Sequence, residues 1–161
     1  MIKNIITMSA MQAVQYVFFN RMGVENFAII SIQEYETNGN GYIFTKTGCC
    51  KDVLTLNFSD ADPKVFEKYN ETHILNELLE EDQCKLFSQE DAKAIKEFVD
   101  KINQNEEITE LIIHCSLGVS RSPAVAAAIH KYLFGNTGEF FEKQLPNIYV
   151  YEKLMNVLRG E

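Results

Sequence analysis

The apolar and polar positions along the chain alternate between strand-like and helix-like patterns. The apolar runs at residues 27–32 and 111–113 are typical of buried strands, and residues 2–7 also resemble a strand. The polar and apolar alternation over residues 52–58 predicts another strand. Residues 38–41 read Asn-Gly-Asn-Gly, which predicts a turn. We expect a further strand directly after this turn, at residues 42–46.

Two helices are predicted by start signals that precede apolar stripes. Ser9 and Gln12 have the spacing of a capping box, and Ser88 and Asp91 repeat that spacing before a second helix. The stripes consist of Met11, Val14 and Phe18 in the first helix, and of Ile95, Phe98, Val99 and Ile102 in the second.

Two more helices are predicted towards the C-terminus. An alanine-rich helix is expected to begin at Arg121 and to end near Gly135, and an amphipathic helix is expected after Pro146 and Asn147. Strands and helices in alternation predict an α/β fold, with a central, mostly parallel sheet flanked by helices.

The size and composition are those expected for one soluble domain. The chain has 161 residues, of which 46% are hydrophobic and 24% charged, so we expect a single domain over residues 1–161. No segment approaches the ~20 apolar residues of a membrane span, and the N-terminus lacks the pattern of a secretory signal, so a cytoplasmic location is expected. The four cysteines, Cys49, Cys50, Cys84 and Cys115, do not have the spacing of a disulfide framework.

The formal net charge of −8 restricts the partners that the chain can bind. No basic block is present that could neutralise a phosphate backbone or an anionic lipid surface, so neither nucleic acid nor a membrane is expected as a partner. A phosphate group must therefore be held by a local site within a negative overall field. The oligomeric state is not predicted.

Residues 114–122, which read His-Cys-Ser-Leu-Gly-Val-Ser-Arg-Ser, carry most of the candidate chemistry. They connect the predicted strand at 111–113 with the alanine-rich helix, and therefore form a tight loop. Such a loop can turn several backbone N–H groups inward, where the unpaired donors and the positive dipole of the helix start also point. Arg121 adds a planar fork that holds two phosphate oxygens, and Gly118 permits the sharp turn.

The same surroundings favour the thiolate form of Cys115, which is the nucleophilic form. An anion site with its own nucleophile indicates phosphoryl transfer. The alternative is that Cys115 is a small buried residue at a strand end and Arg121 a surface cation. The glycine, the flanking hydroxyls and the strand-loop-helix context all agree with the anion site instead.

The residues His114, Cys115, Gly118, Arg121 and Ser122 resemble the HCxxGxxR[ST] signature of cysteine-dependent protein phosphatases, and are most similar to the small dual-specificity branch. The resemblance implies that Cys115 forms a phosphocysteine intermediate, that Arg121 binds the phosphate, and that Ser122 helps the thiolate to leave. His114 would hold the loop and tune the thiolate, or would simply be satisfied in the core. The resemblance implies no metal or other cofactor, and the phosphate would be bound by Ser116, Leu117, Gly118, Val119, Ser120 and Arg121.

Hydrolysis of a phosphate ester requires a proton for the leaving oxygen. The predicted strand at 52–58 leads into an acidic, turn-rich segment that contains Asp60 and Asp62. This order resembles the mobile acid loop of the family, and Asp60 follows Phe58 at the spacing of a Phe-x-Asp loop, so we predict Asp60 as the general acid and base. Asp62 is the second candidate for the acid, but it precedes Pro63, and we favour for it the capping of a turn or a helix there.

Asn147 allows two interpretations. The Pro146-Asn147 pair resembles one found before the last helix of dual-specificity phosphatases, where it could brace the site. As a plain helix N-cap Asn147 needs no such role, and this is the interpretation that we favour.

The sequence departs from the family at several points. Leu117 replaces the usual alanine, and the chain has no tryptophan, so a Trp-Pro-Asp acid loop is excluded. The loop lies too late in the chain for the low-molecular-weight tyrosine phosphatases. Phosphoinositide-selective members of the family tend to carry extra cations in this loop, whereas this loop contains no lysine. The resemblance therefore implies phosphorylated protein as the substrate, with phosphotyrosine and phosphoserine or phosphothreonine both open. A phosphate-binding module without turnover, and a nucleotide or RNA 5′-phosphatase, remain alternatives.

Overall fold

The structure, a computed structural model, describes residues 1–20, 23, 25–35 and 41–161. Within these residues the strands β1 (Asn4–Ser9), β2 (Phe27–Gln33), β3 (Cys50–Asn57) and β4 (Glu110–Cys115) form one sheet in the order β1-β4-β2-β3. Every pairing between them is parallel. The predicted α/β class is confirmed, and the Cys115 loop leaves a central strand, β4.

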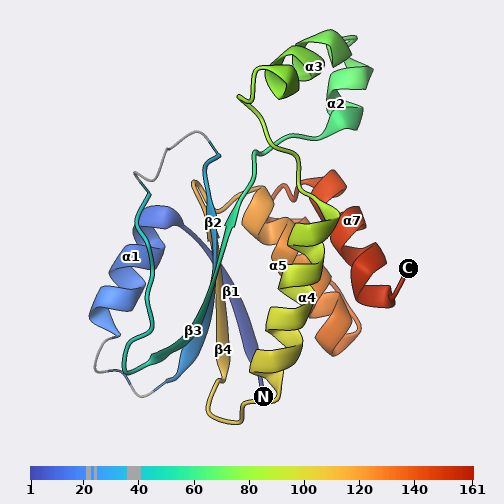
Figure 1. The fold of residues 1–161 in the computed structure, drawn as a ribbon. Coiled ribbons are helices and arrows are strands. Elements are labelled where there is room, and N and C mark those ends of the chain that lie inside the picture. Colours follow the sequence, from blue (N-terminus) through green and yellow to red (C-terminus); the bar gives the residue numbers. More distant parts are fainter. Residues whose placement is uncertain (21–22, 24, 36–40) are drawn as a thin grey trace.

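Helices cover both faces of the sheet (Figure 1). Helix α1 (Ala10–Phe19) lies on one face, and α4 (Gln89–Asn103), α5 (Arg121–Phe134) and α7 (Ile148–Arg159) lie on the other. The short helices α2 (Pro63–Lys68) and α3 (Thr72–Glu80) lie beyond the C-terminal end of β3, and α6 (Phe140–Lys143) follows α5. No helix in the described part of the chain is both long and apolar enough to cross a membrane.

Alternate residues of β2 fill the cores on the two faces. Ala28, Ile30 and Ile32 pack with α4, α5 and α7, whereas Phe27 and Ile29 pack with α1. All five are buried, as expected for a strand covered on both faces. The apolar stripe predicted for α4 is confirmed, since Ile95, Phe98, Val99 and Ile102 are all buried on that helix.

The predicted strand at residues 42–46 is wrong, because this segment has no strand structure. Both edges of β2 are already paired, with β3 and with β4, so no edge of that strand is open to it. The segment instead runs over the α1 side, where the buried Phe44 packs against Tyr42 and His114. Residues 38–40 of the turn predicted at 38–41 lie outside the described residues.

Helix α1 begins as predicted but does not bury the predicted stripe. Both hydrogen bonds of the capping box between Ser9 and Gln12 are present. The buried side chains of the helix are Ala13 and Val17, whereas Met11 is 73% exposed. The helix is apolar around most of its circumference, and the face with smaller residues packs on the sheet.

The structure also contains helices that the sequence patterns did not resolve. Asp62 caps α2, and its side chain accepts a hydrogen bond from Lys64 N, which confirms the predicted capping role. Helices α3 and α6 were not predicted. Leu75 of α3 packs with Ala61 and Cys84 in a small separate apolar cluster beneath this helix pair.

Candidate active site

The backbone of the loop after β4 turns its N–H groups inward. Most carbonyl groups of the loop point outward and accept hydrogen bonds from groups outside the loop. In a trans peptide the C=O and the N–H of the next residue point in opposite directions, so the N–H groups that follow these carbonyls point into the loop. The carbonyls of Ser116, Gly118, Val119 and Ser120 accept from Ala10 N, Gln144 Nε2, Leu145 N and Asn147 N, at 2.7–3.2 Å. The loop therefore presents a concave set of donors, as the sequence predicted.

Gly118 is required by the way the loop packs on the end of β1. Its φ is +76°, and a Cβ at this position would lie 2.6 Å from the carbonyl carbon of Met8 and 2.8 Å from Ser9 N. Both neighbouring atoms belong to the backbone, so they cannot move aside as a side chain can. The glycine is needed both for the turn and for the close approach of the two segments.

We expect Gly118→Ala to destabilise the protein by about 1–3 kcal/mol, because it adds both backbone strain and a steric clash. Unfolding in urea measures this change. Gly135→Ala is the matched control, since Gly135 also has a positive φ of +83° but has open space where a Cβ would lie. An equal loss of unfolding free energy in the two variants would contradict the steric clash and would show that backbone strain alone destabilises Gly118→Ala.

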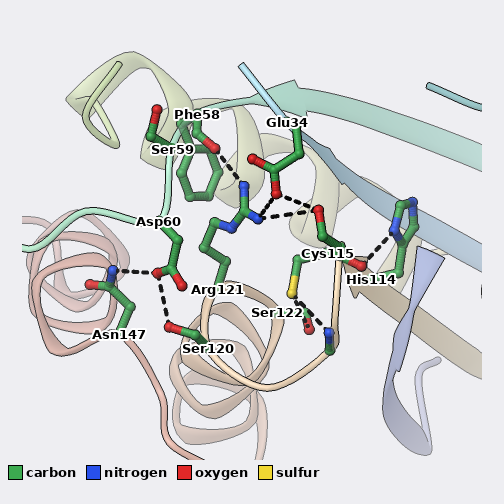
Figure 2. Close-up of polar contacts among 12 residues, drawn as sticks. Glu34, Phe58, Ser59, Asp60, His114, Cys115, Ser120, Arg121, Ser122 and Asn147 are labelled. Carbon is green, nitrogen blue, oxygen red and sulfur yellow. Dashed lines mark hydrogen bonds and ion pairs between the residues drawn. The ribbon is translucent and has the colours of Figure 1, made fainter. Parts of the chain in front are cut away.

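Cys115 lies at the base of this loop and is only 3% exposed. Gly118 N donates to its Sγ at 3.3 Å, and the Oγ of Ser122 lies 3.2 Å from the same sulfur (Figure 2). Both contacts come from groups that can donate a hydrogen bond. The surroundings of the sulfur thus suit a thiolate, which accepts such bonds.

The guanidinium group of Arg121 lies across the mouth of the loop and is almost fully buried. One terminal nitrogen, Nη1, donates to the carbonyl of Phe58 at 2.9 Å, and the other, Nη2, is bound to the carboxylate of Glu34 (Figure 2). The buried Nε has no hydrogen-bond partner among the described residues. Nε is the donor with which an arginine side chain completes a fork for two phosphate oxygens.

Glu34 directly follows β2 and was not predicted as a site residue. Its Oε1 accepts hydrogen bonds from Arg121 and from the hydroxyl of Ser116. Partial burial by itself raises the pKa of Glu34, but the hydrogen bonds from Arg121 and Ser116 outweigh it and hold the pKa below its usual value. Glu34 is therefore a carboxylate that shares the donors of the loop at neutral pH.

We expect Glu34→Gln to strengthen the binding of a phosphate or vanadate anion by about 2- to 5-fold, because the partly exposed negative charge next to the buried Arg121 is removed. Competition against a phosphopeptide or direct calorimetry measures the affinity. Glu107→Gln, a change of the same kind at an exposed position, is the control. Weaker anion binding in Glu34→Gln would instead indicate that Glu34 mainly orients Arg121.

His114 lies behind the loop on β4 and is buried. Its Nε2 is 2.6 Å from the hydroxyl of Ser31, and its Nδ1 is 3.4 Å from the carbonyl of Cys115. Burial lowers the pKa of His114, and the nearby charge of Arg121 lowers it further. The side chain is a neutral imidazole, satisfied within the core, that also touches the backbone of the loop.

Asp60 projects from the segment after β3 towards the start of α5. Its Oδ1 accepts hydrogen bonds from Ser120 Oγ and from Asn147 Nδ2, both at 2.9 Å (Figure 2). Ser120 uses its hydroxyl for this contact and makes no side-chain cap for α5. The structure thus brings Asp60 to the rim of the Cys115 loop.

Asn147 combines the two interpretations that the sequence allowed. Its Oδ1 accepts from Val150 N and so caps α7, as favoured. Its Nδ2 also donates to Asp60 and to the carbonyl of Ala61, at 2.9 and 3.3 Å. The contact with Asp60 could have been found only from the resemblance of the Pro146-Asn147 pair, since no local pattern indicates it.

A cavity of about 630 Å³ lies beside β1 and α6. Its lining comes from β1, from α6 with the residues beside it, and from His130 near the end of α5. It meets the loop through Gln144, which donates to the carbonyl of Gly118 and to Thr7 Oγ1. Cys115, Arg121 and Asp60 do not line this cavity, so the candidate catalytic residues belong to the loop and its rim.

The fold and the loop together define a class: an α/β protein in which a tight loop with inward-pointing N–H groups connects Cys115 with Arg121, at the C-terminal end of a central parallel strand. No protein-family model matches the sequence, and no curated protein matches it at a significant level. The structure is similar to the crystal structure of the human tyrosine phosphatase-like serine/threonine/tyrosine-interacting protein. The TM-score is 0.57 and the identity 16%, and the match covers 97% of this chain and 91% of the human one. The predicted resemblance to phosphatases is thereby confirmed at the level of the fold.

Proposed function

We propose that the protein is a cysteine-dependent phosphatase that hydrolyses phosphate monoesters through a phosphocysteine intermediate on Cys115. The observation that carries the proposal is the set of groups around the Cys115 sulfur. A backbone N–H, a serine hydroxyl and a buried arginine with an uncommitted Nε converge on one loop, and Asp60 lies at its rim. Phosphoryl transfer needs each of these: a nucleophile, donors for the phosphate oxygens, and an acid.

In the first step the thiolate of Cys115 attacks the phosphorus atom, and the bond between phosphorus and the ester oxygen breaks. The inward N–H groups of the loop and the Nε of Arg121 bind the phosphoryl oxygens as charge builds on them. Asp60 donates its proton to the leaving oxygen. Since Oδ1 of Asp60 already accepts two hydrogen bonds, Oδ2 is the oxygen that can carry this proton.

In the second step water attacks the phosphocysteine. Asp60, now a carboxylate, takes a proton from the water, and the bond between phosphorus and sulfur breaks. The electron pair returns to the sulfur of Cys115. The hydroxyl of Ser122, 3.2 Å away, stabilises the departing thiolate by donating a hydrogen bond.

Phosphorylated proteins are the proposed substrates, with phosphotyrosine and phosphoserine or phosphothreonine both accepted. A net charge of −8 disfavours a polyanionic substrate such as RNA. Comparing the turnover of phosphopeptides with that of 5′-phosphorylated RNA tests this choice. We further propose that the protein works in the cytoplasm and without a metal cofactor.

The experiment that tests the proposal is hydrolysis of a chromogenic aryl phosphate between pH 5 and 8, with a reductant and a metal chelator present. We expect turnover that persists with the chelator and stops when the cysteine is alkylated. Turnover that requires a metal ion would contradict the mechanism.

Asp60→Asn is expected to slow the hydrolysis of substrates with poor leaving groups by about 10²-fold or more, and of substrates with good leaving groups much less, since only an alkoxide-like leaving oxygen needs the proton. A series of aryl phosphates with leaving groups of different basicity measures the slope. Asp62→Asn is the matched control, because Asp62 caps α2. If Asp62→Asn shows the steeper slope, the acid has been assigned to the wrong residue.

A second candidate is a phosphate-ester binding module without turnover. Such a module needs only the donors of the loop, such as the Nε of Arg121, and neither a nucleophile nor an acid. The human protein with the similar structure is itself described as tyrosine phosphatase-like and as an interacting protein. Binding of phosphopeptides without any hydrolysis would favour this candidate.

A further inference from the structure

A cavity of about 290 Å³ is lined by Asp60, Ser120 and Asn147. In Figure 2 these three side chains lie on the other side of Arg121 from Glu34. They are hydrogen-bonded to one another at the rim of the candidate active site. The cavity and the phosphate loop therefore share one wall. A group attached to a phosphate in the loop can enter the cavity directly.

Most of the remaining lining is apolar and exposed. Val65 of α2, Leu145 and Ile148, the first residue of α7, are 50%, 83% and 41% exposed. These side chains come from two separate segments of the chain, α2 and residues 145–148, yet they converge on one cavity. Scattered apolar residues on a surface need no explanation, but apolar residues gathered around a hollow are typical of a binding surface.

The charged groups that line the cavity are all acidic. Asp60 and Asp62 line it, and among the described residues no lysine or arginine does. A second negative charge brought into this space would be repelled by the carboxylate of Asp62, and by Asp60 whenever it is ionised, and no cation of the lining would offset this repulsion. The lining thus favours an apolar group and disfavours an acidic one.

We propose that this cavity is the subsite for a large apolar side chain one or two residues away from the phosphorylated residue of a peptide substrate. This inference rests on the proposed function, whose phosphate loop fixes one end of the peptide. An extended peptide advances by about 3.3–3.6 Å per residue, so only near neighbours of the phosphorylated residue reach a cavity that shares the wall of the loop. The volume is at the small end of the ~300–1,000 Å³ of ligand pockets, which suits one or two side chains.

The test measures the affinity of peptides in which phosphotyrosine is replaced by its non-hydrolysable difluoromethylphosphonate analogue. Three peptides carry leucine, alanine or glutamate at the two positions on either side of the analogue. We expect the leucine peptide to bind at least about 5-fold more tightly than the alanine peptide, and the glutamate peptide to bind more weakly than both.

The double variant Val65→Ser/Leu145→Ser is expected to reduce the advantage of leucine to less than about 2-fold, because both apolar walls are lost. Both residues are exposed, so the fold is expected to persist, which thermal unfolding checks. The matched control is Phe19→Ser, since Phe19 is 78% exposed at the end of α1, on the opposite face of the sheet. Phe19→Ser is expected to keep the full preference.

The subsite and the proposed function can fail separately in this design. Equal affinities for the three peptides, or an unchanged preference in Val65→Ser/Leu145→Ser, would overturn the subsite even if the protein hydrolyses aryl phosphates. A preference for leucine in a protein that does not hydrolyse aryl phosphates would uphold the subsite and overturn the phosphatase. Failure of all three peptides to bind would contradict both.

Discussion

Cys115→Ser is expected to reduce the hydrolysis of aryl phosphates by at least about 10⁴-fold, because a serine hydroxyl in the same place is a far poorer nucleophile than a thiolate. The sulfur is the atom that Gly118 N and Ser122 Oγ contact, so the substitution removes the proposed nucleophile from the centre of the loop. The same variant is expected to bind phosphopeptides at least as tightly as the wild type, since the negative charge of the thiolate is removed while the donors of the loop remain.

The control for this variant is Cys84→Ser, which makes the same chemical change in the small cluster beneath α3. Cys84→Ser is expected to keep the turnover of the wild type. Residual hydrolysis by Cys115→Ser within about tenfold of the wild type would refute the assignment of the nucleophile. A variant that neither hydrolyses nor binds, but that unfolds at lower temperature, would show that Cys115 acts through the packing of the loop instead.

Arg121→Lys is expected to lower kcat/KM by at least about 10²-fold, although the positive charge is kept. The guanidinium group spans from the carbonyl of Phe58 to the carboxylate of Glu34 and still leaves Nε for a phosphate oxygen. A lysine ammonium is a single centre, and it cannot make these contacts and a phosphate fork together. Steady-state kinetics with an aryl phosphate, together with the affinity for vanadate, measures the loss.

Arg159→Lys is the matched control, because Arg159 lies in the last turn of α7 and is exposed. It is expected to leave both the kinetics and the vanadate affinity unchanged. If Arg121→Lys binds vanadate as tightly as the wild type, Arg121 serves to hold the loop to Phe58 and Glu34, and it is not a phosphate ligand.

Comparison of the sequence patterns with the structure separates local from long-range information. The local signals predicted the main elements correctly. The capping boxes at Ser9 and Ser88 marked the starts of α1 and α4, Gly135 marked the end of α5, and the apolar run at 111–113 marked β4. Each of these signals acts within a few residues of chain. The patterns failed at residues 42–46, which have β propensity but lie outside the sheet, on the α1 side, where Phe44 is buried against His114.

Glu34 and the second role of Asn147 show what local patterns do not contain. Glu34 contacts Arg121 across 87 positions of sequence, and it does so because β2 lies next to β4 in the sheet and both strands end at the same edge. Asn147 and Asp60 are likewise 87 positions apart, and the start of α7 must pack beside the loop before they can bond. Neither contact can be predicted from the sequence pattern around Glu34 or Asn147.

The sequence by itself therefore determined the α/β class, the loop from Cys115 to Arg121 and the candidate chemistry of that loop. The proposed chemistry needs a cysteine, a glycine and an arginine around one small anion, and residues that surround so small a group can lie within nine positions of sequence. Only the tertiary structure decided the order of the strands, the carboxylate that meets Arg121, and the apolar cavity beside Asp60. These depend on which distant segments the core brings together, because burial of the two faces of the sheet fixes that arrangement and no short stretch of sequence does.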